Sequence, residues 1–193
     1  MTHRSLTLIG VLGLLAPAVS LFSHAAESRW QPLFDGRSLA GWHAVNDVTF
    51  ETHEDCIRLV RGMGWLRTER RYGDFILEFE CCPLVENYDS GLYFRAGLDG
   101  KPWPDGGWQV NLRHDMLGGL VKGYSAKVPA RTPGVPVGQW VKLRLVVKGS
   151  TASLDVDGER AWEFDQLDAE RGYLGIQAED RAFDFRNIRL LEL

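Results

Sequence analysis

The sequence predicts an all-β fold, a sandwich of two antiparallel sheets that follows a removable leader. Segments in which apolar and polar residues alternate recur along the chain, and they are rich in β-branched and aromatic residues. Gly, Pro, Asp or Asn separate them, as is typical of short strands in a sandwich. Helical periodicity is almost absent, although 166–171 could form a single helical turn.

The first residues have the features of a secretory signal peptide. A short basic start precedes an apolar run from Leu6 to Phe22, and Ser23-His24-Ala25 follows as a small-x-small cleavage pattern. A membrane anchor is the alternative, but Pro17 interrupts the run, which falls short of the ~20 apolar residues that a spanning helix needs. We therefore expect residues 1–25 to be removed. Residues 26–193 should form one domain, periplasmic or secreted, with no membrane contact after cleavage.

Charge and cysteine content narrow the class of protein further. The formal net charge is −4 and the basic residues are scattered, so nucleic acid is not an expected partner. In an oxidising compartment Cys56 could pair with either Cys81 or Cys82. Adjacent residues of a strand point to opposite faces, so at most one of the two can join Cys56. This spacing does not match that of a cysteine metal site.

The expected strands follow one another with short turns. The clearest turn is Asp157-Gly158, because both positions of a type I′ hairpin turn need residues that tolerate positive φ. Two longer loops, 97–107 and 125–139, are of the kind that is usually functional or mobile, and Trp103 in the first is expected at a rim. In chain order the expected strands are Val48–His53, Cys56–Val60, Gly64–Thr68, Asp74–Cys82, Ser90–Ala96, Trp108–His114, Trp140–Lys148, Thr151–Val156, Glu159–Phe164, Gly172–Ala178 and Phe183–Leu193.

The segment from position 89 to position 95 carries the strongest functional signal. Side chains alternate across a strand, so Ser90, Leu92 and Phe94 are expected in the core. The opposite face then presents a carboxylate, a bare glycine, an aromatic ring and a guanidinium, a set that suits a polar ligand of sugar size. A merely solvated outer face is the alternative. The residues on this opposite face are Asp89, Gly91, Tyr93 and Arg95.

Other expected strands are two-sided in the same way. In Trp108–His114, for example, polar residues alternate with apolar ones that suit a core. Solvated second faces of antiparallel sheets usually carry mixtures of Lys, Thr and Glu, whereas amides, an aromatic ring and arginines gather here. We therefore predict a concave binding sheet. Its polar side chains would be Asp89, Tyr93, Arg95, Gln109, Asn111, Arg113 and Gln177.

Several short motifs occur in a fixed order along the chain. Leu33–Trp42 is similar to an LF(N/D)G-x-x-L-x-GW pattern, and 89–95 to (N/D)SG(I/L)-x-FR. Near the end, 172–177 and Phe185–Arg189 are similar to G-x-I-G-L-Q and FRNI-x-I. Each motif is short, but the ordered set is specific. With it the chain resembles the 3-keto-disaccharide hydrolase family over nearly the whole mature length.

This resemblance implies a concanavalin A-like jelly roll that holds a carbohydrate over its concave sheet. It also implies cleavage of glycosides whose C3 hydroxyl has been oxidised to a ketone. The ketone acidifies the C2 proton, so a base can remove it, the C1 substituent can leave, and water can then add. Such a site needs a general base, a proton donor and a group that stabilises the enolate oxygen, for which an arginine, amides or a divalent cation could serve.

The chain departs from the family pattern at two positions. The family usually has Glu-x-Gln where this chain has Gln109 and Asn111, and many members have His where Glu179 stands. These departures move the expected base to Glu80, Asp89, His114 or Asp115. The catalytic candidates are Glu80, His114 and Asp115, and the substrate-binding candidates are Asp89, Tyr93, Arg95, Gln109, Asn111, Gln177 and Glu179.

Structural roles are the alternatives for two of the catalytic candidates. Glu80 could form an ion pair with Arg95 across neighbouring strands, and His114 could be an ordinary surface residue. For the whole chain the main alternative is a carbohydrate-binding module on the same fold, since Gln109 replaces an acid. A retaining glycosidase is less favoured, because the segment 78–82 does not match the Glu-x-Asp-x-x-Glu strand of such enzymes. A structural interaction domain would call for an apolar concave face.

Overall fold

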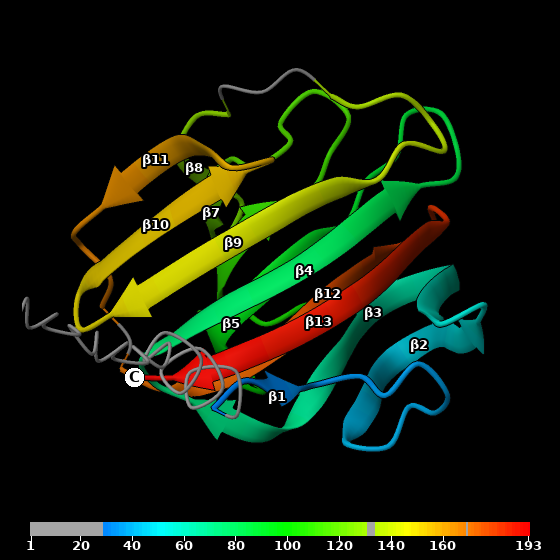
Figure 1. Ribbon diagram of the computed structural model, residues 1–193, viewed down its shortest axis with the longest axis horizontal. Coiled ribbons are helices and arrows are strands. Elements are labelled where there is room, and N and C mark those ends of the chain that lie inside the picture. Colours follow the sequence, from blue (N-terminus) through cyan, green and yellow to red (C-terminus); the bar gives the residue numbers. More distant parts are fainter. Residues whose placement is uncertain (1–28, 131–133, 169) are drawn as a thin grey trace, which may run out of the picture.

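The computed structural model describes residues 29–130, 134–168 and 170–193, and these form an antiparallel β-sandwich without helices (Figure 1). The expected signal peptide lies outside the described residues. The strands are β1 (Gln31–Pro32), β2 (Trp42–His53), β3 (Cys56–Tyr72), β4 (Phe75–Pro83), β5 (Gly91–Ala96), β6 (Trp108–Asn111), β7 (Leu120–Lys122), β8 (Ser125–Val128), β9 (Val141–Lys148), β10 (Thr151–Val156), β11 (Glu159–Phe164), β12 (Gly172–Glu179) and β13 (Phe183–Glu192).

Hydrogen bonds link the strands into one continuous sheet that folds over into two layers. The strand order is β11-β10-β9-β4-β13-β3-β12-β5-β6-β7-β8. The long strand β3 belongs to both layers, because Ile57–Leu59 pair with β13 whereas Met63–Tyr72 pair with β12. In Figure 1 the layer with β9, β4 and β13 lies in front of the layer with β12 and β5. The all-β sandwich prediction is confirmed.

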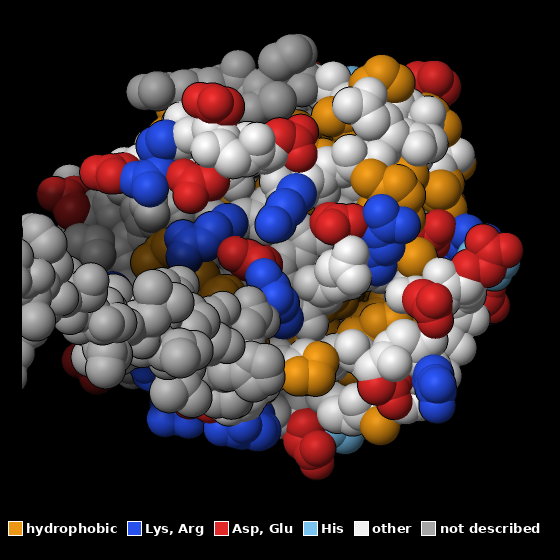
Figure 2. Space-filling model, viewed as in Figure 1, with side chains coloured by type: hydrophobic (Ala, Val, Ile, Leu, Met, Phe, Trp, Pro, Cys, Tyr) orange, Lys and Arg blue, Asp and Glu red, His pale blue; other side chains and the backbone are white. Residues whose placement is uncertain are grey.

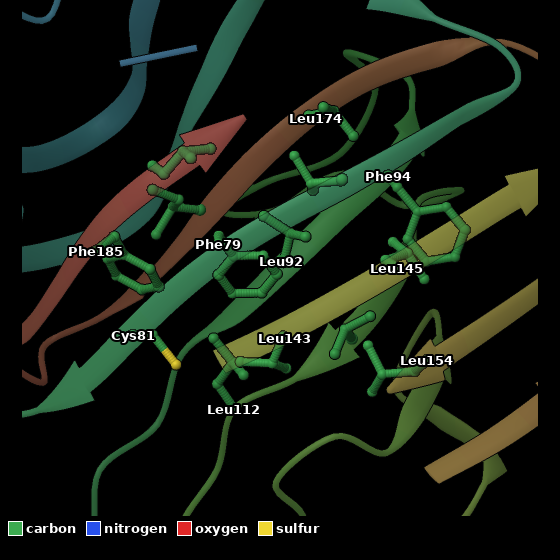
Figure 3. Close-up of a cluster of buried hydrophobic side chains, with 14 of the residues drawn as sticks. Phe79, Cys81, Leu92, Phe94, Leu112, Leu143, Leu145, Leu154, Leu174 and Phe185 are labelled. Atoms are coloured by element: carbon green, nitrogen blue, oxygen red, sulfur yellow. The ribbon is translucent and has the colours of Figure 1, made fainter. Parts of the chain in front are cut away.

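The core lies between the two layers and is made by alternate residues of each strand. Phe79 and Leu145 come from one layer, and Leu92 and Leu174 from the other, and all four are buried (Figure 3). Burial of a large apolar side chain contributes roughly 1.5–3 kcal/mol, so this seam holds the layers together. The inward residues are those that the alternation predicted in β4, β5, β6 and β12.

The strand boundaries differ from the sequence-based expectation in several places. The strand β2 begins at Trp42 and not at Val48, and β6 ends at Asn111 and not at His114. Cys56–Val60 and Gly64–Thr68 belong to a single strand, β3, in which Gly62 and Gly64 adopt positive φ values of 105° and 154°. A Cβ at Gly62 would lie 2.1 Å from the Asp47 carbonyl, so only glycine lets β2 approach there. The strands β7 and β8 had been expected as loop or left unassigned. No helical turn forms in the described part of 166–171, whereas Asp157-Gly158 makes the expected hairpin turn.

The front layer carries a lattice of ion pairs on its solvent side, where Figure 2 shows basic and acidic side chains intermixed. Glu78 of β4 receives hydrogen bonds from Arg144 of β9 and from Arg189 of β13. Glu80 of β4 receives hydrogen bonds from Arg186 (2.8 Å) and Asn187 (3.0 Å). Each carboxylate is therefore neutralised across strands, as is typical of paired strands on an outer face.

The three cysteines carry free thiols in the structure. The pairing of Cys56 that the sequence left open does not form, because strand β13 lies between the two candidate strands. Phe185 of β13 pairs with Cys81 of β4 on one side and with Ile57 of β3 on the other. Strands that both flank a third are about 10 Å apart, beyond the reach of a disulfide.

Candidate functional site

A pocket of about 400 Å³ opens on the rear layer, on the side turned away from the core. We call this side, formed by β12, β5, β6 and β7, the pocket face. The volume of the pocket lies within the range of small-molecule sites. The residues that line it are Asp89, Tyr93, Trp103, Pro104, Gln109, Asn111, Arg113, Met116, Val121, Gly123, Tyr124, Ala126, Gln177 and Glu179.

The pairing register sorts these residues by chemical type along the strand direction. Tyr93 of β5 stands opposite Gln109 of β6, and Gln109 stands opposite Val121 of β7. Two residues further along is a row with Gly91 and Asn111, and beyond it lie Asp89 and Glu179. Rows of one face repeat every ~7 Å along a strand. The pocket therefore runs from carboxylates at one end, through amides, to aromatic and aliphatic groups at the other.

A chain of side-chain hydrogen bonds crosses the floor of the pocket. Gln109 donates to the amide oxygen of Gln177, and Gln177 donates to Glu179 at 2.9 Å. The Gln109 side chain lies directly over Gly91, where an added Cβ would be 2.0 Å from Nε2. Both glutamines are buried, so the chain also satisfies their amide groups.

We expect the Gly91→Ala substitution to impair the site more than the fold. The new methyl group would displace Gln109 and break its hydrogen bond to Gln177, which would leave Glu179 less well oriented. The expected result is a loss of ligand affinity or turnover of about tenfold, the size of one to two buried hydrogen bonds. Titration calorimetry or initial rates would measure it. Gly106→Ala, where an added Cβ has open space, is the matched control; equal behaviour of the two variants would contradict this role of Gly91.

Two carboxyl groups at the polar end have perturbed acidity. Burial, and after it the charge of Asp89, raises the pKa of Glu179 to about 7. Burial also raises the pKa of Asp89, although the positive charge of Arg113 opposes this. Carboxyl groups that share a partly dry site cannot both ionise easily. One of the pair can therefore hold a proton while the other acts as a base near neutral pH.

An arginine lies beside this carboxyl pair and is fixed from outside the pocket. Arg113 lines the pocket and donates hydrogen bonds to the exposed carboxylate of Asp115. The backbone N–H of Arg113 donates to the side-chain oxygen of Asn111 at 2.9 Å, which leaves the Asn111 amide N–H groups to donate elsewhere. The polar end thus offers a guanidinium and an amide as donors to an anionic oxygen.

The structure brings six of the seven substrate-binding candidates together in this pocket. They are Asp89, Tyr93, Gln109, Asn111, Gln177 and Glu179. Arg113, Trp103 and Tyr124 also line it. Arg113 was already visible in the alternation of its strand, and Trp103 in the Pro- and Gly-rich loop. Tyr124 lies in a segment that the strand pattern did not resolve, and no sequence signal pointed to it.

The placement of Arg95 on the pocket face was wrong. Tyr173 pairs with Ala96 but Gly175 pairs with Tyr93, so β5 has one more residue than β12 between these pairs. This is a β-bulge, and Arg95 occupies it with a positive φ of 49°. The bulge interrupts the alternation of side chains, so the guanidinium leaves the pocket face.

The Arg95 guanidinium instead ties together turns of the opposite layer. It donates to the carbonyls of Gly73 (3.3 Å) and Gly149 (2.7 Å) and to the carboxylate of Asp74 (2.9 Å). Only 1% of its side chain is exposed. Gly149 also donates its N–H to Asp74 at 3.0 Å. Arg95 is therefore a structural residue that joins the two layers.

The three catalytic candidates do not line the pocket. Glu80 lies on the solvent side of the front layer, where it lines a separate pocket. It pairs with Arg186, so the alternative ion pair with Arg95 was wrong. Its pKa is lowered: burial opposes ionisation, but the hydrogen bonds from Arg186 and Asn187 outweigh it. His114 is exposed and packs edge-on against Tyr88 outside the pocket. Asp115 accepts a hydrogen bond from Arg113, which lines the pocket.

The described residues provide neither a metal cluster nor a membrane-spanning helix. Within 29–130, 134–168 and 170–193, no three His, Cys, Asp or Glu side chains are grouped to hold a metal ion. No helix among these residues is long and apolar enough to cross a bilayer.

Solved structures share this fold at low sequence identity. A candidate glycosyl hydrolase from Parabacteroides distasonis ATCC 8503 superposes with a TM-score of 0.73 at 18% identity, over 88% of this chain and 96% of that one. The carbohydrate-binding module CBM66 from Bacillus subtilis superposes with a TM-score of 0.66 at 19% identity, over 79% and 96%. A Bacillus subtilis protein of unknown function with a galectin-like fold gives 0.65 at 12%, over 84% and 94%.

The architecture and these similarities define a galectin-like jelly-roll sandwich. The family model of the 3-keto-alpha-glucoside-1,2-lyase-like domain matches residues 29–191, and the chain belongs to that family. The resemblance seen in the sequence motifs is thereby confirmed. No curated protein gives a significant match.

Proposed function

We propose that this protein cleaves 3-keto-glycosides in the pocket of its rear layer. The observation that carries the proposal is the pair Asp89 and Glu179, two carboxyl groups of raised pKa at the polar end of a sugar-sized pocket. Membership of the 3-keto-alpha-glucoside-1,2-lyase-like family supports the choice of substrate. The expected leader at residues 1–25 supports export to the periplasm or the medium.

In the proposed reaction Glu179 is the general base. A ketone at C3 acidifies the neighbouring C2–H bond, and the Glu179 carboxylate, with its pKa near 7, accepts that proton. The electron pair moves toward the C3 oxygen, which becomes an enolate. Asn111 and Arg113 supply the donors that stabilise the negative oxygen.

The ionised Asp89 raises the pKa of Glu179, so the protonated Glu179 can serve as the acid in the second half of the reaction. The C1–O bond breaks as the enolate collapses, and the departing oxygen takes the proton that Glu179 accepted from C2. The products are a free alcohol and an enone. Water then adds at C1 and a proton returns to C2, which gives the 3-keto sugar.

Turnover of synthetic 3-keto-glucosides tests this function. We expect the wild-type protein to release a 3-keto sugar and free aglycone from the oxidised substrate, and to leave the matching unoxidised glucoside intact, because only the ketone acidifies C2. Product formation would be followed by chromatography, with and without chelator. The alternative function is that of a carbohydrate-binding module, favoured by the similarity in fold to CBM66. Saturable binding of the 3-keto-glucoside without product would select that alternative.

A further inference from the structure

One side of the pocket is an aromatic and aliphatic cleft. Pro104, Val121 and Ala126 line it together with the rings of Trp103 and Tyr124. The charged residues that line the pocket are Asp89, Arg113 and Glu179, and none of them belongs to this cleft.

The Trp103 ring is held in place by contacts on several sides. Its indole N–H donates to the Ala178 carbonyl at 3.0 Å, and the ring packs against the cluster formed by Trp65 and Tyr93. Asn46 of β2 donates to the Pro102 carbonyl at 2.6 Å and so fixes the loop just before it. Trp103 is therefore a preformed wall that needs no ordering when a ligand binds.

Tyr124 is held at the mouth of the pocket by an unusual turn. Gly123 and Tyr124 connect β7 to β8, and both have positive φ, 48° and 58°. This backbone is normally occupied by Gly, Asn or Asp, and a bulky residue there is an outlier that suggests a function. The Tyr124 residue is 80% exposed, and its ring centroid lies 6.2 Å from that of Trp103.

The contacts place this cleft next to the proposed base. The Trp103 indole binds the carbonyl of Ala178, the residue before Glu179, and the Tyr124 ring lies 6.2 Å from that of Trp103. A sugar with its C2 proton at Glu179 would thus have these two rings within reach of its leaving group.

We propose that Trp103 and Tyr124 form a leaving-group subsite that selects 3-keto-glycosides with an aromatic aglycone. This inference rests on the proposed function for the position of the sugar, and it adds the class of leaving group. A second sugar would need partners for several hydroxyl groups, whereas this half offers mainly ring faces and aliphatic carbon. An aromatic ring can stack in the offset or edge-on geometries that such rings favour.

Three 3-keto-glucosides of simple alcohols test the subsite. Benzyl and cyclohexylmethyl alcohol have the same size and leaving-group type but differ in aromaticity, and methanol lacks a ring. In the wild type we expect kcat/KM to be highest for the benzyl compound. In Tyr124→Ala the benzyl-to-methyl ratio should fall about 3- to 10-fold, mainly through KM, which is the size of one aromatic contact. Tyr124→Phe should keep the ratio.

The control variant is Leu98→Ala, because Leu98 is 55% exposed in the same loop as Trp103 but does not line the pocket. An unchanged benzyl-to-methyl ratio in Tyr124→Ala would overturn the subsite. An equal fall in the cyclohexylmethyl-to-methyl ratio would overturn the selectivity of the subsite for aromatic rings.

Binding to the Glu179→Gln variant, measured by calorimetry, separates the two proposals because it needs no turnover. Tighter binding of the benzyl than of the cyclohexylmethyl compound would support the subsite even if wild type released no product, in which case only the proposed reaction would fail. Equal affinities would overturn the subsite. The turnover result alone would then decide the proposed reaction.

Discussion

Replacing Glu179 with Gln should remove turnover of 3-keto-glucosides while leaving their binding in place. Gln keeps the size and the polar contact with Gln177 but cannot accept the C2 proton. General-base catalysis typically contributes 10²–10⁴-fold, so kcat should fall by about that factor. In the wild type, kcat/KM should rise with pH through about 7, the pKa of the Glu179 carboxyl group.

The matched control is Glu163→Gln, which removes a carboxylate on the distant strand β11 and should turn over like wild type. Full activity of Glu179→Gln would show that another group is the base. Asp89→Asn would then be the next variant to measure, since Asp89 is the other carboxyl group lining the pocket.

The same Glu179→Gln substitution should stabilise the protein at neutral and alkaline pH. The carboxyl group titrates near 4.5 when unfolded and near 7 when folded, so the folded state holds more protons between these values. Wild-type stability therefore declines across this window as pH rises, whereas the variant lacks that decline. Thermal melts should show a Tm advantage of the variant that grows between about pH 4.5 and 7 and is constant above. A pH-independent difference would contradict the raised pKa.

Replacing Arg95 with Ala should destabilise the fold strongly. The substitution leaves two carbonyls without their donor and leaves Asp74 without its cation, at a site that is almost wholly buried. Losses of this kind cost about 2–4 kcal/mol, which for a domain of this size lowers Tm by roughly 5–15 °C. The Tm of Arg95→Lys should lie between those of the wild type and Arg95→Ala, because an ammonium group cannot span the three acceptors as the guanidinium does.

The control for Arg95 is Arg61→Ala, because Arg61 is exposed on β3 and its removal should change stability by no more than about 0.5 kcal/mol. Differential scanning calorimetry would measure all three variants. If Arg95→Ala melted like wild type but lost sugar binding, the sequence-based assignment of Arg95 to the site would be restored.

Periodicity was reliable wherever the strands are regular. The alternation of polar and apolar residues placed Gln109 and Asn111 on one face of β6, and Gln177 on the same face of β12, because two-residue periodicity is a local property of the backbone. It failed at Arg95 because a bulge depends on the pairing partner, which a single strand does not reveal. It also assigned β3 as two strands, because Gly62 breaks the pattern but not the pairing.

The catalytic candidates show a second limit of sequence reasoning. Glu80 sits in a regular strand and its face was identified correctly as the side away from Phe79. The sequence could not tell which layer of the sandwich that strand would join, and hence whether its outward side meets the pocket or open solvent. Glu179 had been assigned to substrate binding, and only the burial it shares with Asp89 suggests a role as base.

By itself the sequence determined the all-β sandwich, the family, the face on which the amides and carboxylates gather and the expectation of a leader. These follow from short-range patterns and motifs that each stretch of chain carries alone. The tertiary structure decided which layer holds the pocket, moved Arg95 out of it, brought Tyr124 to its mouth and set the acidity of Glu179. Those outcomes depend on strand order, on a bulge and on the exclusion of water, and all three arise only when distant parts of the chain are packed together.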